Sequence, residues 1–327
     1  MRSVLGLILL LALGHVALAQ DKLVVSGASG QLGGLVVDEL LARKVPAKDL
    51  ILVSRTPNTE AMKAYAAKGA SVRFGDFTKP ESLAAAYAGG TKMLLISVNG
   101  GGGQRPELHK AAIDAAIAAG VKLIAYTSYV NADVYLDSTI ATDHRRTEQY
   151  LKESGVAWTL LRNQIYAEGL VDQAVQIVRE RKLVTFTPDA RVAYVTREDC
   201  AAAAAAVLAT PGHENRAYNI TGPDAVGPRE LVALASEVSG KRVDLVVMDE
   251  AAYAKSLSES GMPESAIRGA LTFAKELNSP YLREPSTAVA DLTGRPATSV
   301  RKLLTADRGR LRAAAAETGR QSGPSAQ

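Results

Sequence analysis

From Lys22 onward, short runs of apolar and β-branched residues alternate with longer stretches in which apolar residues recur every three or four positions. The first pattern is typical of buried strands and the second of helices packed on one face. Strands are predicted at 23–26, 50–54, 71–74, 93–97, 123–128 and 158–161, and helices at 31–43, 61–68, 82–88, 107–119 and 143–154. Apolar strands that alternate with helices form parallel sheets covered on both faces. We therefore predict an α/β fold with a doubly wound parallel sheet, a Rossmann-like domain over residues 22–165.

The alternation loosens beyond residue 165. Short strands are predicted at 183–186, 193–195, 218–220 and 243–247, and helices at 198–210, 229–239 and 264–277. This mixture predicts a smaller C-terminal substrate lobe over residues 166–306, with some segments returning to the main sheet. Small and polar residues dominate the end of the chain, so residues 307–327 are predicted to form a disordered tail.

The first residues differ from the rest of the chain. Arg2 is followed by an apolar run at 4–13, and Ala17-Leu18-Ala19 matches the small-residue site at which signal peptidases cut. We predict a signal peptide over residues 1–19 and an exported protein, periplasmic or secreted. The run is shorter than the roughly 20 residues that span a bilayer, so no stable membrane insertion is expected after signal removal. The alternative is a start site near Asp21 and a cytoplasmic protein.

Charge and composition exclude several classes of function. The net charge of +4 arises at the C-terminal end, because residues 301–327 hold six Lys and Arg against two Asp and Glu, a difference of four. The remaining residues balance, so we expect no nucleic-acid partner. Cys200 is the single cysteine, which rules out an intramolecular disulfide and suits a small core residue. His109, His144 and His213 lack the spacing of metal ligands, so no metal site is expected.

A glycine-rich turn joins the first strand to the first helix. In this turn Gly27 permits the sharp bend, Gly30 lets the backbone approach a diphosphate, and Gly33 allows the helix to pack closely on the strand. The phosphates then meet free N–H groups at the helix N-terminus. The predicted diphosphate-binding residues are Gly27, Ala28, Ser29, Gly30, Gln31, Leu32 and Gly33.

The end of the second strand indicates which dinucleotide is bound. Sites for NAD place a carboxylate there to hold the ribose 2′-hydroxyl, but this strand ends in Ser54-Arg55. A guanidinium suits a 2′-phosphate, so we expect Arg55 to select NADP(H). Asp76, after the third strand, is predicted to flank the adenine, and a role as a helix cap or turn residue fits it equally well.

Two further strand ends face the predicted cofactor. Ser97, Val98 and Asn99 follow the fourth strand, and the glycines at 100–103 then form either a flexible loop over the cofactor or a plain surface loop. The fifth strand ends with Tyr126 and Ser128, whose hydroxyls should lie at the carboxyl edge of the sheet near the nicotinamide.

These motifs, taken in order, resemble the NmrA-like atypical short-chain dehydrogenases, and most closely the type 2 NAD(P)H:quinone oxidoreductases. Triphenylmethane dye reductase is a near relative of that group. The resemblance extends from about Lys22 to Leu304. Besides the glycine turn it rests on Gly103-Gln104-Arg105 with His109, Gly120-Val121-Lys122, Ala125-Tyr126-Thr127-Ser128, His144-x-x-Thr147-Glu148, Leu160-Leu161-Arg162-Asn163, Tyr166 and Tyr218-x-Ile220-Thr221-Gly222.

The resemblance implies roles for the loop after the sixth strand and for several side chains. Ser97, Val98 and Asn99 would lie along the cofactor, and the loop would wrap its nicotinamide end. The loop residues are Leu161, Arg162, Asn163, Gln164, Ile165 and Tyr166. The Tyr-x-x-x-Lys pair of typical short-chain dehydrogenases is absent from 143–154, and His144 stands where related reductases carry a catalytic lysine. His144 either donates a proton or bonds the cofactor ribose, or is a plain structural histidine.

The resemblance implies an NADPH-dependent oxidoreductase that transfers a hydride to a small quinone-like acceptor. Tyr126, Ser128, His144 and Tyr166 are candidates for stabilising the product oxyanion. One alternative is a reductase of azo or triphenylmethane dyes. The other is a non-catalytic NADP(H) sensor of the NmrA type, and the missing Tyr/Lys pair favours this sensor. A homodimer is compatible with the sequence.

Overall fold

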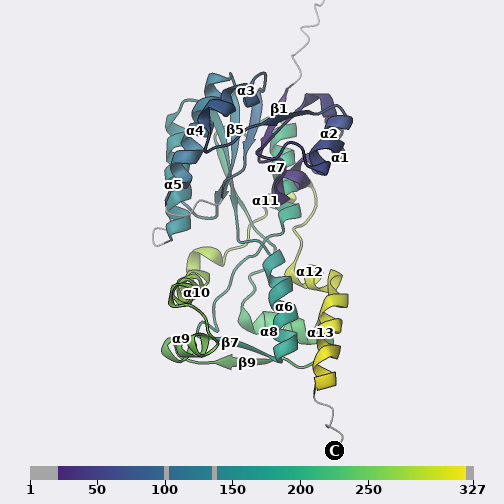
Figure 1. The fold of residues 1–327 in the computed structure, drawn as a ribbon, viewed down its shortest axis with the longest axis vertical. Helices are drawn as coiled ribbons and strands as arrows, with labels where there is room; N and C mark the ends of the chain where they lie inside the picture. The colour runs from purple at the N-terminus through teal and green to yellow at the C-terminus, as the bar shows by residue number, and fades with distance from the viewer. Residues whose placement is uncertain (1–20, 99–102, 135–137, 322–327) are drawn as a thin grey trace, which may run out of the picture.

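The structure, a computed structural model, describes residues 21–98, 103–134 and 138–321. Its main sheet has seven parallel strands in the order β3-β2-β1-β4-β5-β6-β8 (Figure 1). The strands are β1 (Leu23–Ser26), β2 (Leu50–Ser54), β3 (Ser71–Phe74), β4 (Lys92–Leu95), β5 (Leu123–Tyr129), β6 (Ala157–Asn163) and β8 (Arg216–Ile220). The chain winds outward in both directions from β1 and β4, which confirms the predicted doubly wound fold.

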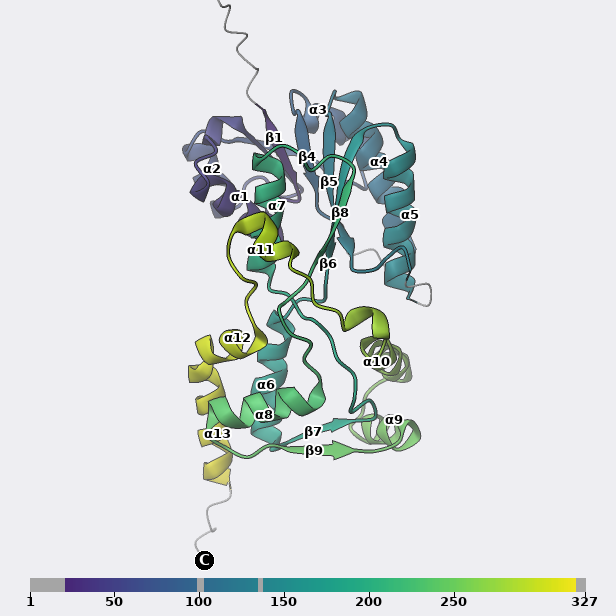
Figure 2. The ribbon, with the colours of Figure 1, turned by 180° about the vertical axis from the view of Figure 1, so that it is seen from behind.

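Helices cover both faces of this sheet (Figures 1 and 2). One layer contains α1 (Gln31–Ala42), α2 (Glu60–Ala67), α7 (Arg197–Ala209) and α11 (Ala288–Thr293), and the other contains α3 (Leu83–Tyr87), α4 (Arg105–Ala118) and α5 (Thr139–Glu153). Within β1, Leu23 and Val25 pack with α1 and α7, whereas Val24 packs with α3 and α4. The strand is apolar throughout because successive side chains enter two different cores.

A second, smaller lobe lies below the sheet in Figures 1 and 2. It contains a two-stranded parallel sheet and six helices of the described residues: β7 (Lys182–Thr185), β9 (Asp244–Val247), α6 (Glu168–Glu180), α8 (Pro228–Ser239), α9 (Glu250–Glu259), α10 (Glu264–Leu277), α12 (Val300–Ala306) and α13 (Arg308–Gln321). Its own core joins α6, α8, α12 and α13. Helix α10 is not part of this core, and its Leu277 packs with Tyr129 and Val130 at the end of β5.

Two predictions for the C-terminal region are wrong. Residues 193–195 form no strand, because Ala193 pairs with Leu282 while Val195 pairs with Ile165, so no single neighbour supplies a ladder. Residues 308–321 of the predicted disordered tail form α13, whose Leu311, Ala314 and Ala315 are buried in the lobe core with residues of α6 and α8. The spacing of these three small apolar side chains places them on one helix face.

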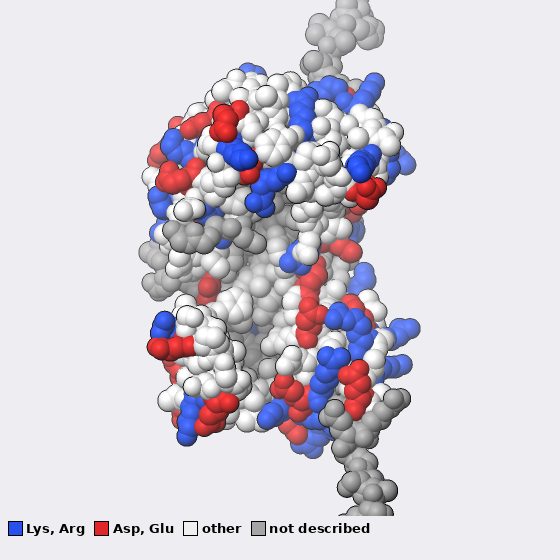
Figure 3. Space-filling model, in the orientation of Figure 1, with Lys and Arg blue, Asp and Glu red and all other residues white. Residues whose placement is uncertain are grey.

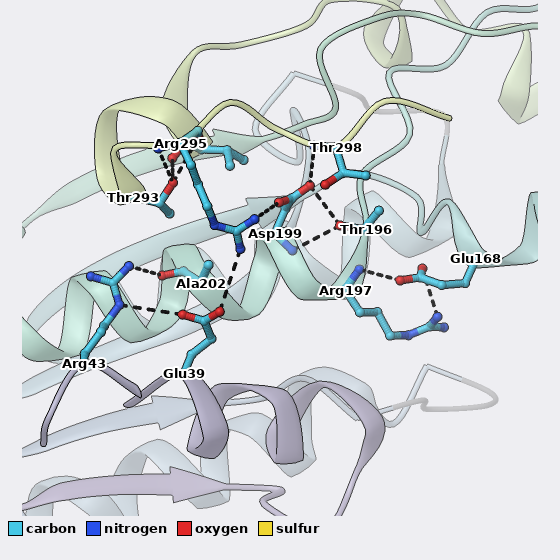
Figure 4. Close-up of polar contacts among 11 residues, drawn as sticks. Glu39, Arg43, Glu168, Thr196, Arg197, Asp199, Ala202, Thr293, Arg295 and Thr298 are labelled. Carbon is cyan, nitrogen blue, oxygen red and sulfur yellow. Dashed lines mark hydrogen bonds and ion pairs between the residues drawn. The ribbon is translucent and has the colours of Figure 1, made fainter. Parts of the chain in front are cut away.

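A buried carboxylate fixes the segment between α11 and α12 to the main layers (Figure 4). Asp199 of α7 is fully buried. It accepts hydrogen bonds from the Thr196 hydroxyl at 2.9 Å, the Thr298 backbone N–H at 2.7 Å and the Arg295 guanidinium at 3.2 Å. Arg295 also lies 3.8 Å from Glu39 of α1. A buried carboxylate must keep its hydrogen-bond partners, so Arg295 and Thr298 are held in place beside Asp199. This fixes the path of the segment that leads from α11 to the lower lobe.

Several predictions concern residues outside the described ranges. These are the signal peptide at 1–19 and the cofactor contact of Asn99, and both stay predictions. The homodimer also stays a prediction. In the described part of the chain, no helix combines the length and the apolar character needed to cross a membrane.

The turn before α1 is shaped by a close backbone contact. Gly27 has φ +95°, a conformation that side-chain-bearing residues rarely adopt, and its N–H and that of Ala28 both donate to the carbonyl of Val53. A Cβ on Gly33 would lie 2.8 Å from the Ala28 Cα and closer still to the Gly27 carbonyl oxygen. The absence of a side chain at Gly33 therefore lets α1 start directly on the turn.

We expect Gly33→Ala to destabilise the protein by about 1 to 3 kcal/mol, because the added methyl group meets backbone that cannot move aside. The matched control is Gly34→Ala on the same helix, where the nearest atom to a new Cβ is 4.0 Å away. That control should gain about 0.5 to 1 kcal/mol from the lower backbone entropy of alanine. Urea unfolding measures both, and equal effects of the two substitutions would contradict the close contact.

Candidate functional site

A cavity of about 1000 Å³ opens at the carboxyl ends of the strands, where the chain direction reverses between β1 and β4. Parallel α/β sheets bind ligands at this position. Figure 3 shows the hollow between the upper and lower halves of the molecule. Of the residues predicted from the sequence, it brings together Gly27, Ser29, Gly30, Gln31, Leu32, Gly33, Arg55, Asp76, Ser97, Val98, Ser128, His144, Asn163, Gln164, Ile165 and Tyr166.

Four predicted residues do not line this cavity. Ala28, Leu161 and Tyr126 are buried beneath it. Arg162 instead pairs with Glu148 at 2.7 Å and Asp133 at 2.9 Å. The cofactor contacts of Ala28, Leu161 and Arg162 stay predictions, and the loop that lines the cavity begins at Asn163, where β6 ends. Tyr126 contributes indirectly, through the hydrogen bonds described below.

The cavity also contains residues that the sequence did not single out for a role. Arg105 of α4, Arg197 of α7 and Phe273 of α10 line it. Arg105 belonged to a motif of the resemblance, and no chemistry was assigned to it. Arg197 and Phe273 come from the second half of the chain, and no local pattern indicates that they return to the strand ends.

The α1 end of the cavity is suited to phosphate. Helix α1 has no side-chain cap and no acidic residue in its first turn, so its first N–H groups are available to a ligand. The exposed Arg55 lies beside them. The hydroxyls of Ser29 and Ser54 are 2.6 Å apart, and Ser54 also accepts from the Thr56 backbone N–H at 2.8 Å. This end therefore combines positive charge with hydrogen-bond donors.

Asp76 faces the same cavity and serves as a turn residue. Its carboxylate accepts from the backbone N–H and the hydroxyl of Thr78, at 3.0 Å and 2.9 Å. These hydrogen bonds and the positive charge of Arg55 lower the pKa of Asp76, although partial burial opposes them. Asp76 is therefore ionised at neutral pH and lies in the electrostatic field of Arg55.

The residues present fit a bound dinucleotide. A side chain at Gly33 would fill the turn where α1 exposes its N–H groups. At the other end of the cavity, the buried Oδ1 of Asn163 has no hydrogen-bond partner among the described residues. A buried acceptor of this kind is costly unless a ligand N–H or O–H satisfies it. Both observations indicate a ligand that spans the cavity from α1 to β6.

A chain of hydrogen bonds leads from the backbone to His144. The Val98 N–H donates to Nε2 of His109 at 3.0 Å, so the proton of His109 is on Nδ1. That Nδ1 lies 3.2 Å from the Tyr126 hydroxyl, which in turn lies 2.7 Å from Nδ1 of His144. The Thr147 hydroxyl also lies 3.1 Å from Nδ1 of His109. In the arrangement where His109 donates to Tyr126, Tyr126 donates to His144 and the proton of His144 is on Nε2. The ring nitrogen of His144 left for a ligand is then an N–H donor.

Burial keeps this chain uncharged. It lowers the pKa of His109 to about 3, and together with the charge of Arg105 it holds the pKa of His144 well below its usual value. Burial also raises the pKa of Tyr126 above that of a free phenol. At neutral pH all three side chains are neutral, so His144 can donate a hydrogen bond but is not a charged acid.

The Tyr166 ring contacts Arg197, whose ion pair with Glu168 is drawn in Figure 4. The Arg197 guanidinium lies 4.4 Å from the centre of the Tyr166 ring, and Glu168 binds both the backbone N–H of Arg197, at 2.7 Å, and its guanidinium, at 3.1 Å. Burial raises the pKa of Tyr166. The cation–π contact fixes the ring at the end of the cavity nearest the lower lobe. In the described residues no group of three or more His, Cys, Asp or Glu is arranged to hold a metal ion.

Comparisons with known proteins confirm the family resemblance. The model of an NAD(P)H-binding family matches residues 27–211. The chain is 35% identical to quinone oxidoreductase 2 of Escherichia coli over 82% of this chain and 96% of that protein. The structure is similar to the NADPH-dependent quinone oxidoreductase of Escherichia coli in complex with NADPH (TM-score 0.79, 34% identity, 87% and 99% of the two chains). It is also similar to triphenylmethane reductase of Citrobacter sp. in complex with NADP(H) (TM-score 0.78, 33%, 87% and 99%).

We expect Arg55→Gln to reduce the preference for NADPH over NADH by about tenfold to a hundredfold, because a charge-assisted bond to the 2′-phosphate is lost. Dissociation constants for both dinucleotides measure this preference. The control is Lys63→Gln, which removes one positive charge from α2 outside the cavity. An unchanged preference in Arg55→Gln would show that Arg55 does not meet the 2′-phosphate.

We also expect acid to destabilise the protein through the neutral histidines. The pKa of His109 is about 3 in the folded chain and about 6.5 in the unfolded chain, so between these values the unfolded state binds one more proton. The contribution of His109 to the free energy of unfolding is fully present above pH 6.5. Below that pH it decreases by about 1.4 kcal/mol per pH unit. Urea unfolding at pH 7.5 and 5.5 should show a smaller loss in His109→Gln than in the wild type. Equal losses would mean that folded His109 is not held neutral.

Proposed function

The chain belongs to the NAD(P)H-binding, NmrA-like family of oxidoreductases, and from this premise we propose that it transfers a hydride from NADPH to a quinone-like acceptor. The similarity to quinone oxidoreductase 2 of Escherichia coli supports the proposal, both in sequence and in the structure solved with NADPH bound. Nearly the full length of that protein matches this chain.

The neutral N–H donor of His144 carries the proposal. Reduction of an isolated ketone produces a strongly basic alkoxide, which requires a proton donor matched to it. Reduction of a quinone produces a hydroquinone anion whose charge is spread over a ring, and a hydrogen bond is enough to stabilise it. His144 offers such a bond and little acidity, because burial and Arg105 hold its pKa low. The absent Tyr/Lys pair is consistent with the same class of acceptor.

Each part of the cavity has a task in this reaction. When bound, the dinucleotide supplies the hydride. The N–H groups at the start of α1 hold its diphosphate, and Arg55 holds the 2′-phosphate. Asn163 and Tyr166 border the acceptor, and the Nε2–H of His144 donates to an acceptor oxygen. The acceptor gains the hydride and one proton from solvent and becomes the hydroquinone.

A second candidate activity is the reduction of triphenylmethane dyes. The similarity to the Citrobacter triphenylmethane reductase favours it. A triphenylmethane dye is a delocalised cation, so transfer of a hydride to its central carbon yields a neutral product without any proton. The site has no need of an acid for this acceptor either, and both activities can belong to one cavity.

We expect the purified protein to oxidise NADPH with 1,4-naphthoquinone, at a rate that changes little between pH 6 and 8 because His144 stays neutral throughout. His144→Leu removes the N–H donor and should lower kcat/KM by about tenfold to a hundredfold. Absorbance of NADPH at 340 nm measures both. The control is His213→Leu, which removes a histidine outside the cavity.

Two results would contradict this account. If His144→Leu matches His213→Leu in kcat/KM and pH profile, His144 is not the donor. If the protein binds NADPH but turns over with no quinone or dye, it is a sensor of NADP(H) rather than a reductase. Binding measured by calorimetry separates the second result from a protein that has lost its cofactor site.

A further inference from the structure

A second cavity, of about 420 Å³, lies in the lower lobe next to the first. Ile165, Tyr166 and Phe273 line both cavities, so the two meet at the end where Asn163 and His144 face the acceptor. Phe273 is 47% exposed, which is unusual for a large aromatic side chain. The first cavity therefore continues past these three residues into the lower lobe.

The two cavities differ in charge. Arg55, Asp76, Arg105 and Arg197 line the first. No Asp, Glu, Lys or Arg is among the residues that line the second cavity. Its apolar lining residues include Leu170, Val192, Leu231, Ala270, Ala274 and Leu277, and its polar ones, which are uncharged, include Gln173, Thr185, Thr187, Tyr194 and Tyr253. A phosphate or carboxylate placed there would lose its hydration without gaining a charged partner, whereas apolar groups would gain from burial. The second cavity thus suits an uncharged apolar group.

Small residues on facing helices keep this space open. Ala270 and Ala274 lie one turn apart on α10 and present methyl groups where longer side chains would fill the cavity. Across the cavity, Gly169 of α6 also lines it, and a Cβ there would meet nothing within 4 Å. The neighbouring lobe core is packed around Leu170 and Leu231, so the cavity is bordered by ordered structure.

We propose that the second cavity binds an apolar alkyl or isoprenoid chain attached to the ring of the quinone acceptor. This inference rests on the proposed function and names its substrate class. The ring lies against His144 and Asn163, and the chain leaves it between Ile165, Tyr166 and Phe273. The exposed side of Phe273 is then covered by the chain. A volume of about 420 Å³ lies within the range of cavities that hold organic ligands.

The test compares acceptors that share one ring and differ in the chain: 2-methyl-, 2-butyl- and 2-octyl-1,4-naphthoquinone. Burial of each methylene favours binding by up to about fourfold, so kcat/KM for the octyl compound should exceed that for the methyl compound by at least about tenfold. The same three compounds are titrated by calorimetry into protein saturated with NADP⁺. This second measurement reports chain binding even without turnover.

The cavity-filling variants are Ala274→Phe and Ala270→Phe. Each should reduce the octyl-to-methyl ratio of kcat/KM, and of affinity, toward one. The matched control is Ala266→Phe, an exposed position on the same helix that does not line the cavity. It should keep the wild-type ratio. Thermal unfolding of all three variants identifies any that fails to fold, and the second filling variant then decides.

The outcomes separate this inference from the proposed function. A wild-type ratio near one, or a ratio that both filling variants leave unchanged, overturns the chain-binding cavity. Turnover of none of the three acceptors overturns the proposed function, and the calorimetric affinities then still decide whether the cavity prefers the octyl compound. A falling ratio in the filling variants with an unchanged ratio in Ala266→Phe supports the inference.

Discussion

The close approach of α1 to the turn before it is the constraint on which the rest of the site depends. Because Gly33 has no side chain, the helix begins against the Gly27 carbonyl, and its first N–H groups point into the space at the strand ends. The turn itself is held by two hydrogen bonds to Val53, the residue before Ser54 and Arg55. One local geometry thus sets both the donors for a diphosphate and the position of the guanidinium beside them.

The polar chain from Val98 to His144 shows how several elements together orient the side chain of the proposed hydrogen-bond donor. Its members come from the end of β4, from α4, from β5 and from α5, so no single element determines the tautomer of His144. In a poorly hydrated interior each partner must be satisfied, and a neutral chain with one direction of donation meets that requirement. Burial holds His144 neutral by lowering its pKa, and the hydrogen bond between its Nδ1 and Tyr126 orients the ring. This combination favours acceptors whose reduced form is already a stable anion or a neutral molecule.

Local sequence signals were enough to predict most of the upper half. The doubly wound sheet, the glycine turn and Arg55 follow from patterns that lie within a few positions of one another, whereas the roles of residues 163–166 were implied only by the family resemblance. The structure of the lower lobe was harder to predict from the sequence. Ala193 and Val195 pair with different distant segments, and α13 is stabilised by contacts of its apolar residues with α6 and α8. Arg197 and Phe273 reach the cavity only through the chain's return between lobes. The ion pairs of Arg162 with Glu148 and Asp133 could not be predicted either, because these partners lie on other elements.

The two cavities differ in the interactions by which they can bind a ligand. The upper cavity is bordered by charges, helix N–H groups and hydroxyls. Hydrogen bonds to these groups depend on direction, so they favour binding of a ligand whose polar atoms are in fixed positions. The lower cavity has no charged lining residue. The free energy of binding there depends mainly on the apolar area that a ligand buries, and this contribution has no preferred direction. Tyr166 belongs to both cavities and is fixed by Arg197 and by its backbone bridge to Val195. Ala270 and Ala274 of α10 line the lower cavity and not the upper one, so changes in these side chains alter what fits below Tyr166 at a distance from the turn that holds the phosphates. Selection of the ligand below Tyr166 is therefore physically separable from binding of the dinucleotide above it.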